Sequence, residues 1–143
     1  MDIQGIAHKL RRAAADFGMP FEGAATIYNS RHAQELSLWA ETKKRGNELH
    51  SAIFKAYFVY GQNISSIPML SELASSVGLS GDEASEILKT GAFKAAVDED
   101  WDLAGEMRVT AVPTVIMNQD RLVGAYPYSA FERLMESNGI KKK

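Results

Sequence analysis

The 143-residue sequence contains no cysteine, so its residues can form no disulfide, no thiolate metal site and no cysteine nucleophile. It also lacks a long apolar run: the clusters at 57–60 and 115–117 are far too short to span a bilayer. No unbroken apolar stretch follows basic residues near the N-terminus, as a secretory signal would require. We therefore expect a cytoplasmic protein that does not bind membranes.

The sequence likewise lacks a large excess of charge of either sign. The formal net charge is −2, and Lys and Arg are mixed with Asp and Glu along most of the chain. No basic patch with interleaved aromatic residues is present, which excludes the usual pattern of nucleic-acid binding. With 45% apolar and 24% charged residues, the sequence predicts one globular domain over residues 1–143.

Most of the sequence has the three- and four-residue apolar spacing of amphipathic helices. We expect six helices before residue 109, covering roughly 3–17, 31–45, 48–60, 66–77, 81–90 and 93–107. Their starts carry capping residues: Asn29 and Ser30, Ser66 before Pro68, and Ser80 with Glu83 in a capping box.

The pattern changes at Val109. The following stretch is rich in β-branched residues and is interrupted only by Pro113, as expected of a strand. The polar run 118–121 predicts a turn to a second strand, and Ser129 with Glu132 predicts a capping box for a last helix. The fold class is therefore α+β and mostly helical: a helical region over 1–108, then a β-hairpin and a C-terminal helix over 109–143.

Two groups of motifs resemble one protein family. Ala-Val-Pro-Thr-Val-Ile at 111–116, followed by a turn, a strand ending at Gly124 and a helix, resembles the C-terminal β-β-α half of a thioredoxin-like fold. Asn-Ser-Arg at 29–31, Ala-Tyr-Phe at 56–58 and Asn-Ile-Ser at 63–65 resemble the helical insertion of DsbA-family proteins of the FrnE and 2-hydroxychromene-2-carboxylate isomerase type. The likeness extends over nearly the whole chain.

The sequence also departs from that family. Its members begin with a strand and a C-x-x-C motif, or a serine in the isomerases, and then a second strand; none of these is matched here. The family name would imply a thiol–disulfide oxidoreductase, but this chain has no cysteine, so whether it is an enzyme stays open. We expect no exchange activity from the chain by itself.

The resemblance identifies Val112, Pro113 and Thr114 as candidates for binding a substrate or peptide. In thioredoxin-like proteins the bond before this proline is cis, and the neighbouring backbone offers N–H and C=O groups to an extended substrate or to glutathione. The alternative is that Pro113 serves only the geometry of the turn. We assign no catalytic residue and no cofactor, with glutathione as the one cofactor that the family would suggest.

Other polar residues have simpler explanations. His8, His32 and His50 lie on different expected helices without a partner four residues away, so no metal site is predicted. The acidic residues at 98–102 lie opposite an apolar face and are expected to be solvated. Tyr57, Tyr60, Trp39 and Trp101 would either line a ligand cleft or belong to the core.

Three functions follow. The first is a truncated DsbA-like protein acting through binding or assembly, in which the exposed edge of strand Thr114–Met117 pairs with a second copy or with a complementing chain. The second is one half of a split oxidoreductase, completed by a partner that carries C-x-x-C. The third is an isomerase-like protein that binds glutathione or an aromatic acid.

Overall fold

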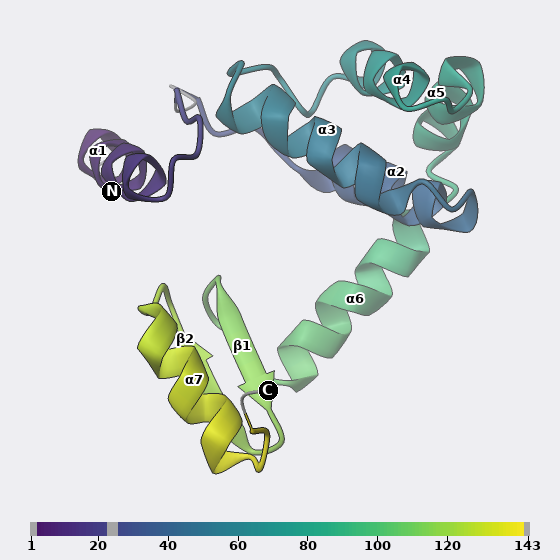
Figure 1. The fold of residues 1–143 in the computed structure, drawn as a ribbon. Coiled ribbons are helices and arrows are strands. Elements are labelled where there is room, and N and C mark those ends of the chain that lie inside the picture. The colour runs from purple at the N-terminus through teal and green to yellow at the C-terminus, as the bar shows by residue number, and fades with distance from the viewer. Residues whose placement is uncertain (1–2, 23–25, 142–143) are drawn as a thin grey trace. The chain divides into compact units, whose positions relative to one another are not determined.

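The computed structural model describes residues 3–22 and 26–141. It confirms the expected order of helices, hairpin and closing helix (Figure 1). The helices are α1 (Ile3–Asp16), α2 (Arg31–Thr42), α3 (Gly46–Phe58), α4 (Ile67–Ser76), α5 (Gly81–Thr90), α6 (Lys94–Glu106) and α7 (Tyr128–Ser137). The strands are β1 (Thr114–Met117) and β2 (Asp120–Val123).

The chain forms two compact units, a helical unit over residues 1–99 and a hairpin unit over residues 100–143. The division falls inside α6, whereas the sequence placed the change of character after that helix. Among the described residues, no helix is long and apolar enough to cross a membrane.

The core of the helical unit lies between α2, α3, α4 and α5. Leu36, Leu49 and Leu70 are fully buried there, and Trp39 is 3% exposed. Trp39 is therefore a core residue. α2 and α3 run side by side, while α4 and α5 pack against each other (Figure 1).

Helix starts in this unit follow the capping chemistry of the sequence. Ser66 and Ser80 each accept a hydrogen bond from a backbone N–H three residues later, at 3.5 Å and 3.1 Å. Asn29 accepts one from the backbone N–H of Arg31, whereas Ser30 makes no capping bond with its side chain. Gly91 ends α5 with φ of 65°, a left-handed conformation that favours glycine.

The hairpin unit contains one antiparallel pair of strands. Thr114 lies opposite Val123 and Met117 opposite Asp120, so the turn consists of 118–119 and is shorter than the polar run 118–121 that was expected. Ala130 and Leu134 of α7 are the buried residues of that helix. The expected capping box at Ser129 is wrong, because α7 begins at Tyr128 with Pro127 as its N-cap, two residues before Ser129.

Arg121 of β2 reaches the end of α6 within the same unit. Its guanidinium donates to the backbone carbonyl oxygens of Met107 and Arg108, at 3.1 Å and 3.2 Å. These carbonyls follow the last turn of α6, where an α-helix leaves its acceptors without intrahelical partners. The contact explains why a charged residue occupies a strand of this small sheet.

Candidate functional site

The three residues that the sequence singled out lie together just before and at the start of β1. Val112 is 88% exposed, Pro113 is also exposed, and the peptide bond between them is cis. The hydroxyl of Thr114 donates to the carbonyl oxygen of Ala111 at 2.6 Å and closes this turn. The loop therefore presents an apolar side chain and backbone groups to solvent.

The hydrogen bonds of the hairpin show which backbone groups of β1 point outward. Gly124 donates its backbone N–H to the carbonyl oxygen of Pro113 at 2.7 Å. In an antiparallel pair the hydrogen-bonded positions alternate, so the backbone N–H and C=O groups of Val115 and Met117 point toward β2. The N–H and C=O groups of Thr114 and Ile116 consequently lie on the outer edge of β1.

That outer edge has no strand on it within the described residues, because the sheet there consists of β1 and β2 alone. β1 carries no charged side chain, and Val115 is 36% exposed. Natural proteins usually protect such an edge with a lysine, a proline, a bulge or a covering element. An open apolar edge of this kind can bind an extended strand.

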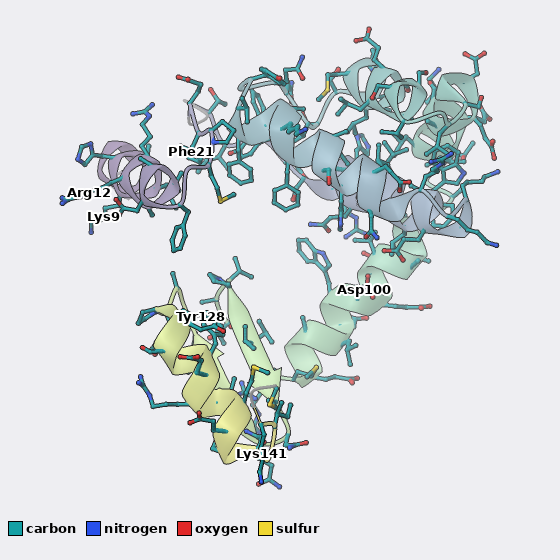
Figure 2. The ribbon with its side chains drawn as sticks, viewed as in Figure 1. Lys9, Arg12, Phe21, Asp100, Tyr128 and Lys141 are labelled. Atoms are coloured by element: carbon teal, nitrogen blue, oxygen red, sulfur yellow. The ribbon has the colours of Figure 1, made fainter. Side chains whose placement is uncertain are left out.

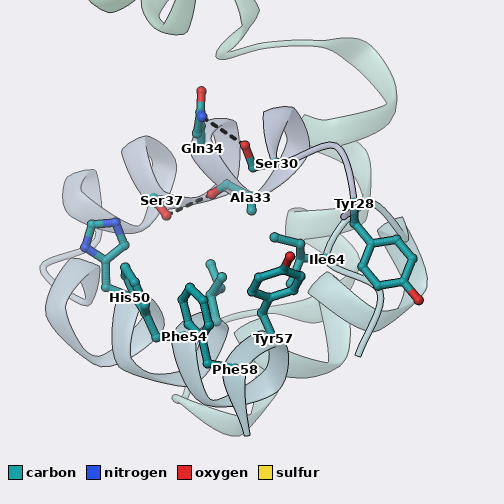
Figure 3. Close-up of a pocket in the computed structure, with 11 residues that line it drawn as sticks. Tyr28, Ser30, Ala33, Gln34, Ser37, His50, Phe54, Tyr57, Phe58 and Ile64 are labelled. Carbon is teal, nitrogen blue, oxygen red and sulfur yellow. Dashed lines mark hydrogen bonds between the residues drawn. The ribbon is translucent and has the colours of Figure 1, made fainter. Parts of the chain in front are cut away.

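A second candidate site lies inside the helical unit. Figure 3 shows a pocket between α2 and α3, with a cavity volume of about 370 Å³. Phe54, Tyr57 and Phe58 of α3 form one wall, and Ala33 and Ser37 of α2, with Ser30 just before that helix, form the other. Of the aromatic residues proposed from the sequence, only Tyr57 lines it; Tyr60 is 69% and Trp101 59% exposed.

Small side chains on α2 explain why the pocket exists. Ser30, Ala33 and Ser37 recur at three- and four-residue steps and place little volume opposite the rings of α3. The rings hold one another: Phe54 and Phe58 stack with centroids 5.6 Å apart, and Tyr57 meets Phe58 edge-on at 4.8 Å. This pocket was not predicted from the sequence, although small residues on one helix and aromatic residues on the next were a usable signal.

The three histidines lie on three different helices, His8 on α1, His32 on α2 and His50 on α3. Among the described residues no group of three or more His, Cys, Asp and Glu side chains could hold a metal ion. His32 contacts the backbone carbonyl oxygen of Ser65 at 3.2 Å, and His50 lines the pocket. His50 therefore has a place in a candidate binding site that the spacing of the histidines did not indicate.

The acidic residues of α6 are exposed at positions 98–100, in agreement with the solvated face that was expected; Figure 2 labels Asp100. Asp98 forms an ion pair with Arg31. Within residues 3–22 and 26–141, the carboxyl groups whose pKa is clearly displaced are those of Glu48 and Glu83. The pKa of Glu48 is lowered by backbone hydrogen bonding and then by Arg45, and that of Glu83 by its hydrogen bond to Lys43. Neither residue lines the pocket.

Comparisons with known proteins agree with this architecture. The family model described as DSBA-like thioredoxin domain matches residues 1–136. The uncharacterized protein YwbO of Bacillus subtilis (strain 168) is 31% identical over 105 residues, which cover 73% of this chain and 52% of YwbO. The chain thus spans about half the length of this curated relative.

Two solved structures share the fold. A probable DsbA oxidoreductase from Streptomyces coelicolor superposes with a TM-score of 0.84 at 23% identity, over 98% of this chain and 62% of that one. A 2-hydroxychromene-2-carboxylate isomerase superposes with a TM-score of 0.79 at 21% identity, over 96% of this chain and 69% of that one. At these identities the likeness establishes the fold and leaves the chemistry open.

Proposed function

Because the chain belongs to the family of DSBA-like thioredoxin domains, we propose that it acts by binding an extended strand along the open edge of β1. The observation that carries the proposal is the outward direction of the backbone groups of Thr114 and Ile116. The 143 residues contain no thiol, so any dithiol–disulfide chemistry at this edge would come from the bound partner. The cytoplasm stays the compartment that the sequence predicts.

A second copy of the chain is the occupant that fits the edge best. If two β1 strands meet around a two-fold axis with Val115 opposite its own counterpart, Thr114 of each copy faces Ile116 of the other. These are the positions whose N–H and C=O groups point outward, so each facing pair exchanges two hydrogen bonds. Every outward backbone group of the strand is then satisfied, and the contact is closed by symmetry.

The support for this pairing is geometric. A shift of the register by one residue would place outward-facing positions opposite inward-facing ones, and the backbone groups would not meet. The exposed Val115 side chains would lie against each other at the axis, where closely spaced non-hydrogen-bonded pairs bring side chains together.

Charge substitution at the axis tests the proposal. Val115→Lys should dissociate the dimer because like charges would face each other, and Val115→Glu should do the same. An equimolar mixture of the two variants should restore a dimer, measured by sedimentation equilibrium and by native mass spectrometry of the mixed species. A wild-type protein that stays monomeric, or a mixture that fails to associate, would contradict self-pairing.

Two proline variants give a matched control. Ile116→Pro removes an outward N–H of β1, whereas Val123→Pro removes an outward N–H on the opposite edge of the sheet. Both leave the bonds between β1 and β2 in place. Only Ile116→Pro should weaken association, and equal effects of the two variants would count against the β1 edge.

A complementing chain is the other possible occupant of the β1 edge. An assay of dithiol–disulfide activity distinguishes it from a second copy. The purified protein should not accelerate the reduction of insulin by dithiothreitol. If adding a C-x-x-C-bearing partner produces activity while the protein alone is monomeric, the split-oxidoreductase hypothesis replaces self-pairing. Activity of the purified chain by itself would refute both.

A further inference from the structure

The pocket between α2 and α3 lies in the helical unit and has no part in strand pairing. We infer that it binds a neutral, planar aromatic molecule of about two fused rings, with one polar group directed to His50. Its cavity volume of about 370 Å³ is within the range of small-molecule sites, toward the lower end.

The shape of the pocket favours a flat ligand. The aromatic side chains of α3 form one side, and the short side chains of α2 form the other, as Figure 3 shows. Tyr28 meets Tyr57 edge-on with ring centroids 6.4 Å apart and stands at one end; His50 stands at the opposite end. A planar molecule inserted along α3 would contact ring faces and edges at once.

The polarity of the lining favours a neutral ligand. No Lys, Arg, Asp or Glu is among the eleven residues of the lining. A carboxylate or an ammonium group would lose hydration there without gaining an opposite charge, which is costly. Glutathione and aromatic acids carry carboxylate groups, so they do not meet this requirement.

The hydroxyl and amide groups on the α2 wall already have partners within that helix region. The hydroxyl of Ser37 donates to the carbonyl oxygen of Ala33 at 2.8 Å, and the amide nitrogen of Gln34 donates to the hydroxyl of Ser30 at 3.1 Å. His50 makes an edge-on contact with Phe54, with ring centroids 6.0 Å apart, and its exposed imidazole nitrogens can donate or accept. His50 is therefore the polar anchor at its end of the pocket.

Exposed aromatic surface supports a ligand in this place. Phe54 is 57% exposed although it lies in the middle of α3. Apolar side chains that face solvent on one side lack close dispersion contacts there. A bound aromatic ring would restore those contacts.

The test uses 2-naphthol as the probe on the whole protein, with binding followed by fluorescence and by NMR shift changes. Two comparison probes share its skeleton: 2-naphthoate adds a negative charge, and decahydro-2-naphthol removes the aromaticity. We expect 2-naphthol to bind at least tenfold more tightly than either. Absence of 2-naphthol binding up to its solubility, or equal binding of 2-naphthoate, would overturn the inference.

Four variants locate the bound probe. Phe54→Ala should weaken binding about tenfold, and His50→Ala about threefold to tenfold through the lost hydrogen bond. Tyr60→Ala removes an exposed aromatic side chain just beyond α3 and should change nothing. Phe54 also lines an apolar groove beside α1, so Phe17→Ala, which alters that groove alone, is the second control.

Weaker binding in Phe17→Ala with unchanged binding in His50→Ala would place the probe in the groove and refute the pocket. Circular dichroism confirms that each variant is folded, and His50→Ala carries the test if Phe54→Ala is not. Concentration-dependent NMR shifts of Phe54 and Tyr57 without any probe would show that a second copy covers the pocket, which would also overturn the inference.

Discussion

Arg31 at the start of α2 donates from its guanidinium to the carboxylate of Asp98 in α6, 67 residues further along the chain. The same Arg31 nitrogen donates to the backbone carbonyl oxygen of Lys94 at 2.9 Å. Its Nε lies 3.6 Å from Oε1 of Glu35, a side chain that is only 4% exposed. One cation thus connects the first turns of two helices and faces a buried carboxylate.

Removing Arg31 should destabilise the helical unit, because Glu35 would be left as a buried charge without its counterion. The second carboxylate oxygen of Glu35 already lacks a hydrogen-bond partner among the described residues. We expect Arg31→Ala to lower the free energy of unfolding by about 2–3 kcal/mol, measured by urea denaturation. Asp98→Asn should cost below about 1 kcal/mol, since the Asp98 side chain is 55% exposed.

A double variant separates the lost charge pair from lost packing. Arg31→Met combined with Glu35→Leu removes both charges and should recover most of the stability that Arg31→Ala loses. If the double variant is as unstable as the single one, the stabilising contribution of Arg31 comes from its contacts with α6.

The pair between Lys43 and Glu83 should be visible in the acid titration of the protein. The ammonium of Lys43 lies 2.6 Å from the Glu83 carboxylate, and this hydrogen bond lowers the pKa of Glu83 below its ordinary value of 4.5. A carboxyl whose folded-state pKa is depressed contributes stability above its unfolded pKa and loses that contribution as pH falls through the folded pKa. The contribution is therefore full above about pH 5 and disappears in more acidic solution.

Lys43→Gln should return the pKa of Glu83 toward its ordinary value, as followed by the carboxyl carbon resonance in an NMR titration. Lys44→Gln is a matched control, because it removes a neighbouring exposed cation that makes no ion pair with Glu83 in the structure. A Glu83 pKa that moves equally in both variants would indicate general surface charge as the cause.

The two serine caps should differ in strength. Ser80 accepts from the N–H of Glu83 at 3.1 Å, whereas Ser66 accepts from the N–H of Met69 at 3.5 Å. Ser80→Ala should cost about 1 kcal/mol of unfolding free energy, and Ser66→Ala clearly less. Thermal or urea unfolding of the two variants gives the comparison, and an equal or reversed order would show that cap distance does not control the cost.

Much of this fold could be predicted from residues whose effects are local. Ser66 with Pro68, Ser80 with Glu83, and Gly91 marked helix ends that the structure confirms. The box at Ser80 is only half formed, since the Glu83 side chain pairs with Lys43 of a distant segment. The apolar spacing of a helix does not predict such partners, because they are distant in the sequence.

The pocket illustrates the same limit. The aromatic residues of α3 are apparent in the sequence, and aromatic residues at helical spacing were expected either to line a cleft or to belong to the core. Phe54 is instead largely exposed, because the facing positions on α2 are small. Which helix faces which depends on tertiary packing, and a single sequence does not encode that choice in any local pattern.

The reach of Arg121 from β2 to the carbonyl oxygens after α6 has a consequence for how the hairpin unit opens. If β1 and β2 separate, the Arg121 guanidinium leaves the end of α6. If that end of α6 unwinds, Arg121 loses the two carbonyl oxygens to which it donates. Amide protons of 103–107 and of 120–123 should therefore exchange with solvent as one cooperative group. A partner bound at the outer edge of β1 would therefore slow amide-proton exchange in α6 without contacting that helix.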